Sequence, residues 1–169
     1  MKLFQLLLGL FIIINWHCVK DDKVLFDLNY EVKVPLTAGL SSNLTHNYNF
    51  FDLQTLYKAA LKANGYTDSQ IKTIEPASAY LLSLDSGSVF DFVQEVSVRI
   101  SDSETFTKEF FYTIQVPLNA NDRLDLVGTL VDAKEYLQND RFNVRVIFKL
   151  RADCPSTFEA KLGMKFIAK

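Results

Sequence analysis

Hydrophobic and polar residues alternate along several segments of this 169-residue chain. The first segment runs from Phe26 to Val34, where apolar residues take every second position and polar residues fill the positions between them. A period of two predicts a β-strand with one buried and one exposed face. Pro35 is expected to end this strand, because proline has no N–H group to donate to a neighbouring strand.

The same alternation returns in the later part of the chain. Turns rich in Asp, Ser, Asn, Gly and Pro separate the alternating segments. In the segment 106–116, the residues expected to face inward are Phe110, Tyr112, Ile114 and Val116. The predicted strands after the first cover residues 77–84, 93–100, 106–116, 124–127, 142–150 and 158–166.

One segment has the periodicity of a helix. Residues 36–51 are predicted to be a long polar connection, after which Asp52 can cap a helix that runs to Asn64. Gly65 then supplies the left-handed residue that ends many helices. Residues 67–70 resemble a capping box, and residues 132–137 predict a second, brief helix. The apolar stripe of the first helix consists of Leu53, Leu56, Tyr57, Ala60 and Leu61.

These elements predict a mainly β fold. Seven strands with polar outer faces and regular turns are typical of an antiparallel β-sandwich of about seven strands, here with one amphipathic helix inserted after the first strand. A small β-barrel is the alternative. Strands and helices do not alternate, which argues against a parallel sheet. Residues 23–169 have the length of a single domain.

The first residues have a different pattern. Lys2 is followed by an almost wholly apolar run over residues 3–14. This length is typical of a secretory signal peptide and is shorter than the roughly 20 residues of a bilayer-spanning helix. We therefore expect residues 1–17 to be a signal peptide. Two alternatives remain open: an uncleaved N-terminal membrane anchor, or an ordinary signal peptide cut elsewhere that leaves Cys18 as a free thiol.

Cys18 follows this leader directly, and Lys20, Asp21 and Asp22 come just after it. An apolar leader that ends at a cysteine and continues with one lysine and two acidic residues resembles the N-terminus of surface-exposed lipoproteins of the Bacteroidetes type. The resemblance covers residues 1–22 and implies that Cys18 carries acyl chains. It also implies that Lys20, Asp21 and Asp22 signal export within a tether of residues 18–22. The implied location is the outer membrane, facing the cell surface; the periplasmic side is the alternative.

Charge and cysteine content narrow the classes of function. The formal net charge is -2 and no basic run occurs, so nucleic acid is not an expected partner. The chain has two cysteines. If Cys18 is acylated, Cys154 has no partner for an intramolecular disulfide, and a small, partly buried Cys154 in a turn is the expected outcome. If Cys18 keeps its thiol, an 18–154 disulfide is conceivable.

Few residues are candidates for catalysis or metal binding. His46 is the single histidine after the leader, and no G-x-S-x-G motif or nucleophile–base pair accompanies it. Clusters of His and Cys at zinc-binding spacing do not occur, and the acidic turns 102–104 and 119–122 do not match a calcium-binding loop. The sequence thus predicts no catalytic residue, no metal ligand and no cofactor, and a protein that is not an enzyme.

A group of aromatic residues surrounds the predicted helix and forms the candidate ligand or partner patch. Exposed aromatic rings can stack on sugars or grip a lipid or protein, whereas Phe50 and Phe51 can instead pack the helix onto the sheet. The leading hypothesis is a non-enzymatic binding or assembly domain of a cell-envelope lipoprotein, with the membrane, an envelope protein or a glycan as partner. An envelope carrier or chaperone for a hydrophobic ligand is the alternative, and a glycan-acting hydrolase is the third. The patch comprises Tyr48, Phe50, Phe51, Tyr57 and Tyr66.

Overall fold

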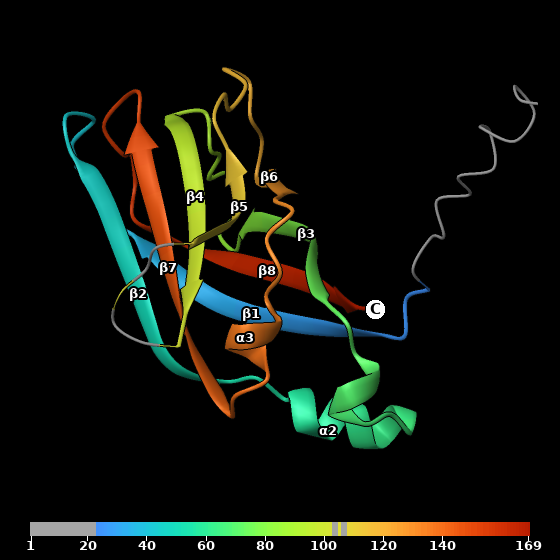
Figure 1. Cartoon of the computed structure of the whole chain (residues 1–169). Helices are drawn as coiled ribbons and strands as arrows, with labels where there is room; N and C mark the ends of the chain where they lie inside the picture. Colours follow the sequence, from blue (N-terminus) through green and yellow to red (C-terminus); the bar gives the residue numbers. More distant parts are fainter. Residues whose placement is uncertain (1–22, 103–104, 106–107) are drawn as a thin grey trace, which may run out of the picture.

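The computed structural model of the chain describes residues 23–102, 105 and 108–169. In this part, eight antiparallel strands form one sheet that curls into a nearly closed, barrel-like shape (Figure 1). The mainly β prediction is confirmed, and the shape corresponds to the barrel alternative. The strands are β1 Phe26–Leu36, β2 Thr45–Gln54, β3 Ile74–Ser83, β4 Val93–Ser101, β5 Lys108–Thr113, β6 Arg123–Gly128, β7 Arg141–Leu150 and β8 Phe158–Ala168, and the helices are α2 Tyr57–Asn64, the 3₁₀ turn Asp68–Gln70 and α3 Lys134–Leu137.

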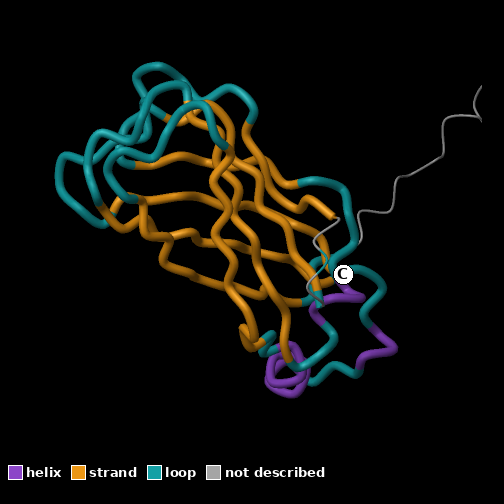
Figure 2. Tube along the Cα trace, turned by 90° about the vertical axis from the view of Figure 1, so that its left-hand side faces the viewer, coloured by secondary structure: helices purple, strands orange, loops and turns teal. Residues whose placement is uncertain are grey.

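The strand order is β1-β8-β3-β6-β5-β4-β7-β2, so the first two strands of the chain are the two edges of the sheet. Within the described residues, β1 pairs with β8 alone and β2 with β7 alone. Figure 2 shows long loops gathered at one end of the curled sheet and the helical segments at the other. Among neighbouring strands only β4 and β5, and β5 and β6, are consecutive in the chain, so the other connections must cross one end of the sheet.

The interior of the sheet is filled by aromatic and branched side chains. Every second residue of β1 is buried, and β7 and β8 bury their alternate residues in the same way. Phe166 contacts the rings of Phe110 and Phe111 at centroid distances of 6.3 and 5.2 Å. Burial of each such side chain is worth roughly 1.5–3 kcal/mol, so this cluster is the main source of stability. The largest fully buried side chains include Tyr57, Phe90, Phe110, Phe111, Phe142, Phe148 and Phe166.

The prediction that Pro35 ends the first strand is wrong. β1 continues through Pro35 to Leu36, and Pro35 lies opposite Glu159 of β8 in an unbroken register. Proline is tolerated in an edge strand wherever its missing N–H would point away from the neighbour. The position of β1 at the edge of the sheet, which depends on strand order, makes this possible.

An additional strand, β2, begins at Thr45 within the connection expected over residues 36–51 and runs on to Gln54, which raises the strand number to eight. The helix consequently follows the second strand. It begins at Tyr57, whereas the sequence predicts a helix that starts after a cap at Asp52. Asp52 lies inside β2 at an irregularity between Phe50 and Leu53, with φ of 59°. The inward side chains of this edge strand are only half-buried, so its alternation is weak in the sequence.

The strand expected over residues 106–116 is shorter and turns its side chains differently. β5 covers Lys108–Thr113, and Phe110 is an extra residue in its ladder with β4, which allows Phe110 and Phe111 both to be buried. Ile114, expected to face inward, lies beyond the strand with 63% of its surface exposed. One extra residue in a ladder shifts every later side chain to the opposite face.

The local signals at Gly65 and at residues 67–70 are confirmed, whereas Asp52, the predicted cap of the first helix, lies in β2. Gly65 ends α2 in the left-handed conformation, and its N–H bonds back to the last turn. Thr67 and Gln70 form the capping box of the 3₁₀ turn. Before α3, the Asp132 carboxylate accepts hydrogen bonds of 2.9 Å from the N–H groups of Lys134 and Ile74. The turns at Gly65 and Thr67 form as the local residues predict because their hydrogen bonds join residues close in the sequence, whereas the bond between Ile74 and Asp132 joins distant segments.

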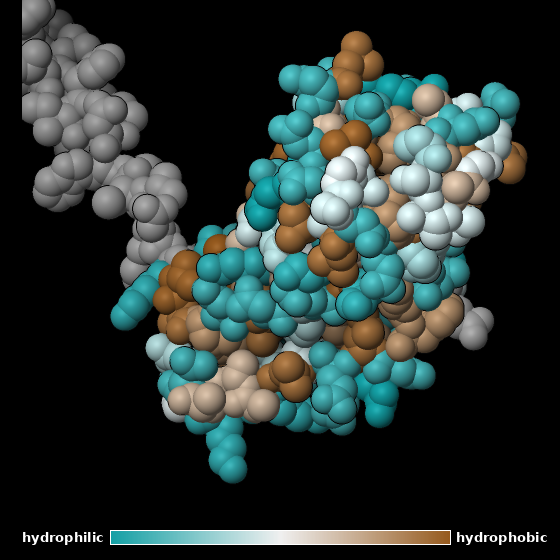
Figure 3. All heavy atoms as spheres, turned by 180° about the vertical axis from the view of Figure 1, so that it is seen from behind, coloured by the Kyte–Doolittle hydropathy of each residue, from teal (hydrophilic) through white to brown (hydrophobic). Residues whose placement is uncertain are grey.

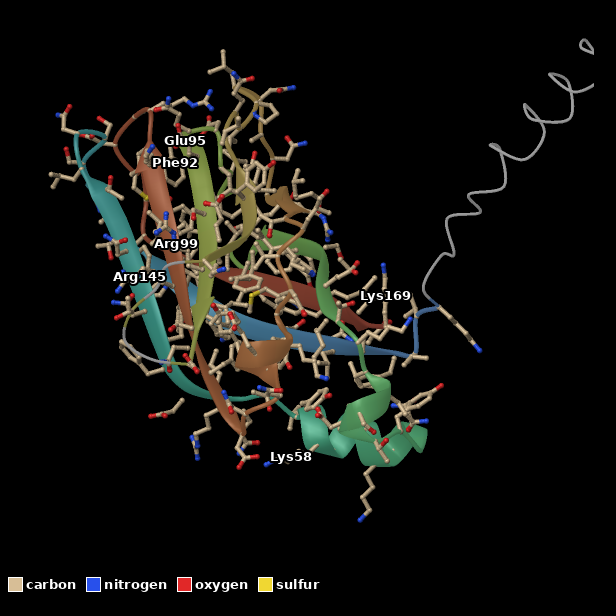
Figure 4. All side chains as sticks on the ribbon, viewed as in Figure 1. Lys58, Phe92, Glu95, Arg99, Arg145 and Lys169 are labelled. Atoms are coloured by element: carbon tan, nitrogen blue, oxygen red, sulfur yellow. The ribbon has the colours of Figure 1, made fainter. Side chains whose placement is uncertain are left out.

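The outer face of the sheet carries most of the charge. Arg99 of β4 and Arg145 of β7 lie side by side in register, and Glu95 follows further along β4 (Figure 4). The Arg145 side chain donates a 2.7 Å hydrogen bond to the side chain of Asn49 in β2. Such polar outer residues keep the sheet soluble and orient its edge strands.

Candidate functional site

A groove of about 370 Å³ lies between the free edge of β1 and helix α2. Carbon-rich side chains form most of its lining, and it opens to solvent at the helix end of the molecule. Figure 3 shows apolar side chains at the surface of this end, beside the point where the described chain begins. The groove is lined by Asp27, Leu28, Asn29 and Tyr30 of β1, by Thr55 and Leu56, and by Ala59, Ala60 and Ala63 of α2.

Helix α2 presents its alanines to the groove because its larger side chains are fixed on the other side. Tyr57 and Leu61 are its buried residues, and the Tyr57 hydroxyl donates a 2.7 Å hydrogen bond to the Asp68 carboxylate. Burial, followed by the hydrogen bond and negative charge of Asp68, raises the pKa of Tyr57. Ala59 and Ala63 are one turn apart, so they lie on the same face. Their small size leaves the space that the groove occupies.

The other wall of the groove is the outer edge of β1, which has no neighbouring strand among the residues that the structure describes. Lys169 exchanges backbone hydrogen bonds with Thr73, at 2.9 and 3.3 Å, so its N–H and C=O point toward β3. The backbone N–H and C=O groups of successive residues in a strand point to opposite sides. Those of Ala168, Phe166 and every second residue before them therefore point toward β1. Their partners in β1 are Phe26, Leu28 and Tyr30. The residues between these partners, which include Asp27 and Asn29, therefore turn their backbone N–H and C=O to the free edge.

One end of the groove is closed by a hydrogen bond across the gap in the sheet. The Tyr30 hydroxyl donates a 2.5 Å hydrogen bond to the Thr55 carbonyl. Thr55 is itself fixed, because its N–H donates to Asp140 at 3.1 Å and its hydroxyl to Asn139 at 2.6 Å. Burial raises the pKa of Tyr30, which keeps the phenol protonated and able to donate. A hydrogen bond from a side chain to a backbone carbonyl thus connects β1 with the end of β2, two strands that do not pair within the described residues.

The chain enters α2 through a backbone conformation that is uncommon for its residue type. Leu56, the residue before the helix, has φ of 54°, and its side chain is 56% exposed at the mouth of the groove. A left-handed conformation at a branched residue costs about 1–2 kcal/mol. The surrounding structure maintains this turn, which sets the direction of α2 relative to β1.

Helix α2 carries positive charge, although neither of its lysines lines the groove. α2 contains Lys58, which is labelled in Figure 4, and Lys62, and it has no acidic residue. Lys58 forms an ion pair with Asp140 at 2.7 Å. On the β1 side, the Asp27 carboxylate lies 2.7 Å from the ammonium group of Lys165. Lys62 has no ion-pair partner within residues 23–102, 105 and 108–169. Its charge therefore remains available to a ligand.

Cys18, Lys20, Asp21 and Asp22 lie outside the described residues. The five aromatic residues of the candidate patch do not form one continuous surface. Tyr57 and Tyr66 both pack on Phe26, at centroid distances of 6.4 and 6.3 Å. The other three belong to β2: Tyr48 packs on Phe148 at 5.8 Å, Phe50 is half-buried, and Phe51 is 53% exposed.

His46 and Cys154 are both engaged in local contacts. His46 Nε2 lies 2.8 Å from the carbonyl of Ser41. Cys154 is buried, its thiol donates to the carbonyl of Ser156 at 3.2 Å, and burial raises its pKa. Among the residues that the structure describes, no cluster of three or more His, Cys, Asp or Glu side chains is arranged to hold a metal ion.

A second and larger depression, of about 570 Å³, lies at the loop end of the sheet. Arg151 forms part of it, but its guanidinium is already bonded to the carbonyls of Val93 and Val116. Its Nε–H donates to Val93 at 3.0 Å. The remaining lining includes Ser42, Asn43, Gln94 and Gln115, which are ordinary residues of polar loops. This depression lacks both the unpaired strand edge and the fixed helical wall of the first groove.

The sequence analysis did not predict the groove, although the composition of helix α2 is unusual in a way that relates to it. The helix 57–64 reads YKAALKAN, with three alanines and two lysines and no acidic residue. Ala60 fits the apolar stripe of the helix, but Ala59 and Ala63 are equally compatible with an exposed surface. Recognition of the groove requires knowing that β1 is an edge strand, which follows from the strand order.

None of the helices in the described part of the chain has the length and hydrophobicity needed to cross a membrane. Comparison of the sequence with protein-family models and with curated proteins gave no match.

Proposed function

We propose that this chain is a cell-envelope lipoprotein whose β domain is a non-enzymatic binding module. The observation that carries the proposal is the order of the first residues: an apolar leader, Cys18, then Lys20, Asp21 and Asp22, and directly afterwards the start of the folded domain. The acyl chains on Cys18 attach the domain to the outer membrane with the domain facing the cell surface. The partner is another component of the envelope.

The physical chemistry of lipid anchors supports this arrangement. Each buried methylene contributes about 0.8 kcal/mol to membrane binding, so two or more chains hold a soluble domain firmly. A residue spans at most about 3.5 Å, so a tether as short as residues 19–22 keeps the domain near the membrane surface. The described chain enters β1 at the helix end of the molecule (Figure 1). That end, with its groove, is then the one nearest the membrane.

The filled interior favours binding at the surface over transport of a lipid inside the domain. A carrier needs an internal cavity of roughly 300–1,000 Å³ for its ligand. Here the centre of the curled sheet contains closely packed rings, including Tyr30 against Phe142 at a centroid distance of 4.8 Å. The groove between β1 and α2, by contrast, is open and has backbone groups available for a partner.

Metabolic labelling with a radioactive fatty acid tests the lipoprotein proposal. The native chain and Cys154→Ala are expected to incorporate label and to sediment with membranes, whereas Cys18→Ala is expected to do neither. Cys154→Ala is the matched control because it removes the other cysteine of the chain. Equal labelling of the native chain and Cys18→Ala, or absence of label from both, contradicts acylation at Cys18.

A further inference from the structure

We propose that the groove between β1 and α2 binds a short, extended, acidic peptide segment, which adds to the free edge of β1 as a further antiparallel or parallel strand. This inference rests on the proposed binding function and specifies the chemistry of its partner. Small apolar side chains of the peptide pack on the alanines of α2, and its acidic residues lie near Lys62.

Backbone hydrogen bonds supply the first reason. Asp27 and Asn29 turn their N–H and C=O groups to the free edge, as the pairing of Lys169 with Thr73 requires. An extended peptide laid along this edge satisfies these groups, and main-chain bonds of this kind hold peptides on sheet edges in many complexes. The Asp27 side chain is held by Lys165 on the outer face, so it does not obstruct the edge.

The shape of the groove supplies the second reason. A strand rises about 3.3 Å per residue, so the edge over residues 27–30 accommodates roughly four residues of peptide. Every second peptide side chain then points toward the core side of the sheet and meets Ala59, Ala60 or Ala63. Because these residues are alanines, the wall leaves space for small side chains such as alanine or valine.

The edge itself limits the length of the peptide. Further along β1, Pro35 has no N–H to offer, and Lys33 carries a charge that discourages strand addition. Tyr30 also closes that side of the groove through its bond to Thr55. A bound segment is therefore confined to the part of the edge beside α2.

Charge complementarity supplies the third reason and indicates that the ligand is negatively charged. Helix α2 contains two lysines and no carboxylate; neither lysine lines the groove, but Lys62 adjoins Ala63 in the sequence and has no ion-pair partner in the described part of the chain. The carboxylate on the opposite wall, Asp27, is neutralised by Lys165. A peptide with acidic residues flanking its apolar centre is attracted to this site, and a basic peptide is repelled.

The probe for this proposal is a fluorescein-labelled peptide in which alternating alanine and valine residues are flanked by glutamates, titrated with the full chain by fluorescence anisotropy. We expect saturable binding and weaker binding of the same peptide flanked by lysines. Peptides N-methylated on alternate residues provide the test of strand addition. One set of methylated positions removes the N–H groups that face β1 and should abolish binding, while the other set should leave it unchanged.

Two protein variants test the location of the site. Ala59→Leu combined with Ala63→Leu fills the groove and is expected to reduce affinity at least about tenfold, while Ala38→Leu, an equal substitution at an exposed loop residue, should not. Lys62→Glu is expected to reduce affinity about two- to fivefold at low salt, and Lys108→Glu on β5 is its charge-matched control.

Three outcomes overturn the proposal: binding that is equally sensitive to both sets of N-methylation, affinity unchanged in the doubly substituted groove variant, or no saturable binding of the acidic peptide. None of these outcomes affects fatty-acid labelling at Cys18. Failure of peptide binding with normal labelling rejects the groove alone, and failure of labelling with normal peptide binding rejects the anchor alone.

Discussion

The hydroxyl of Tyr30 donates a 2.5 Å hydrogen bond to the carbonyl of Thr55 and so connects the two edges of the sheet. Tyr30 belongs to β1, and Thr55 follows β2 directly. These strands are consecutive in the chain but stand at opposite ends of the strand order, and within the described residues neither has a second strand neighbour. A side-chain bond therefore closes the gap that strand pairing leaves open.

Removal of this hydroxyl is expected to weaken the domain. Tyr30→Phe leaves the buried Thr55 carbonyl without its donor, which should lower the free energy of unfolding by about 1–3 kcal/mol. Urea denaturation followed by circular dichroism measures the change. Tyr48→Phe is the control, because Tyr48 is half-buried beside Phe148 and should change stability by less than about 0.5 kcal/mol. Equal stability of the two variants would show that the Tyr30 bond does not contribute.

Gly163 allows the ring of Tyr80 to lie flat across the outer face of the sheet. A Cβ atom at position 163 would lie 2.5 Å from two carbons of that ring. The ring also lies below the guanidinium of Arg123, 4.3 Å from its centroid. Gly163→Ala must therefore displace Tyr80 and should cost about 1–3 kcal/mol.

A double-mutant cycle separates this clash from a backbone effect. In the background of Tyr80→Ala, the substitution Gly163→Ala is expected to be almost neutral, because the ring that it would strike is absent. Unfolding free energies of the four chains provide the measurement. An equal cost in both backgrounds would place the origin of the effect in the backbone of β8.

The parts of the fold that the sequence predicted are those in which burial alternates fully. β7 and β8 combine strong alternation with a completely buried inner face, so period-two patterning is sufficient. β2 was missed because Asn47 and Asn49 alternate with residues that an edge strand buries only in part. Residues 53–61 have helical spacing by coincidence, since Leu53 belongs to a strand and only the later residues belong to α2.

The candidate site could not be predicted for a related reason. The alanines of α2 and the free groups of Asp27 and Asn29 become one groove only through the strand order, and a single sequence does not specify which strands are edges. The aromatic patch groups residues by chemical type, but Tyr57 is 1% exposed and supports the helix. Chemical type alone does not separate a ring that anchors an element from one that binds a partner.

Alkaline pH is expected to destabilise the domain through two tyrosines, the half-buried Tyr136 and the buried Tyr57. Burial, and after it the hydrogen bond and charge of Glu135, raises the pKa of Tyr136 to about 12. Burial and Asp68 raise the pKa of Tyr57 as well. A folded-state pKa above the unfolded value of about 10 means that the stabilisation is complete below pH 10 and is lost as the pH rises through the folded-state pKa.

Urea midpoints between about pH 9 and pH 12 test this dependence. The midpoint should fall over this range, and the fall should be smaller for Tyr57→Phe, which has no phenol to ionise at this position. Tyr66→Phe serves as the control because Tyr66 is less buried and packs on the same ring, Phe26. A pH dependence unchanged by Tyr57→Phe would contradict a contribution from this phenol.

The thiol of Cys154 should be protected in the folded chain. Cys154 is 3% exposed, and burial raises its pKa, so little reactive thiolate is present at pH 8. Reaction with an aromatic disulfide reagent is expected to be at least about a hundredfold slower in the native chain than in urea. The lipoprotein proposal adds that the denatured native chain releases one equivalent of chromophore. Two equivalents would show that Cys18 is a free thiol.

Hydrogen exchange distinguishes the amides of β1 that face β8 from those that face the free edge. The amides of Leu28 and Tyr30 point into the pairing with β8, whereas those of Asp27 and Asn29 point to the free edge. Exchange followed by NMR should therefore be at least about tenfold faster at Asp27 and Asn29 than at their neighbours. Because a bound peptide strand would accept hydrogen bonds from these two amides, saturation with the glutamate-flanked probe should slow their exchange and leave Leu28 and Tyr30 unchanged. Uniform protection along β1 in the free chain would mean that its edge is already covered, and the groove would then have no backbone groups to offer a partner.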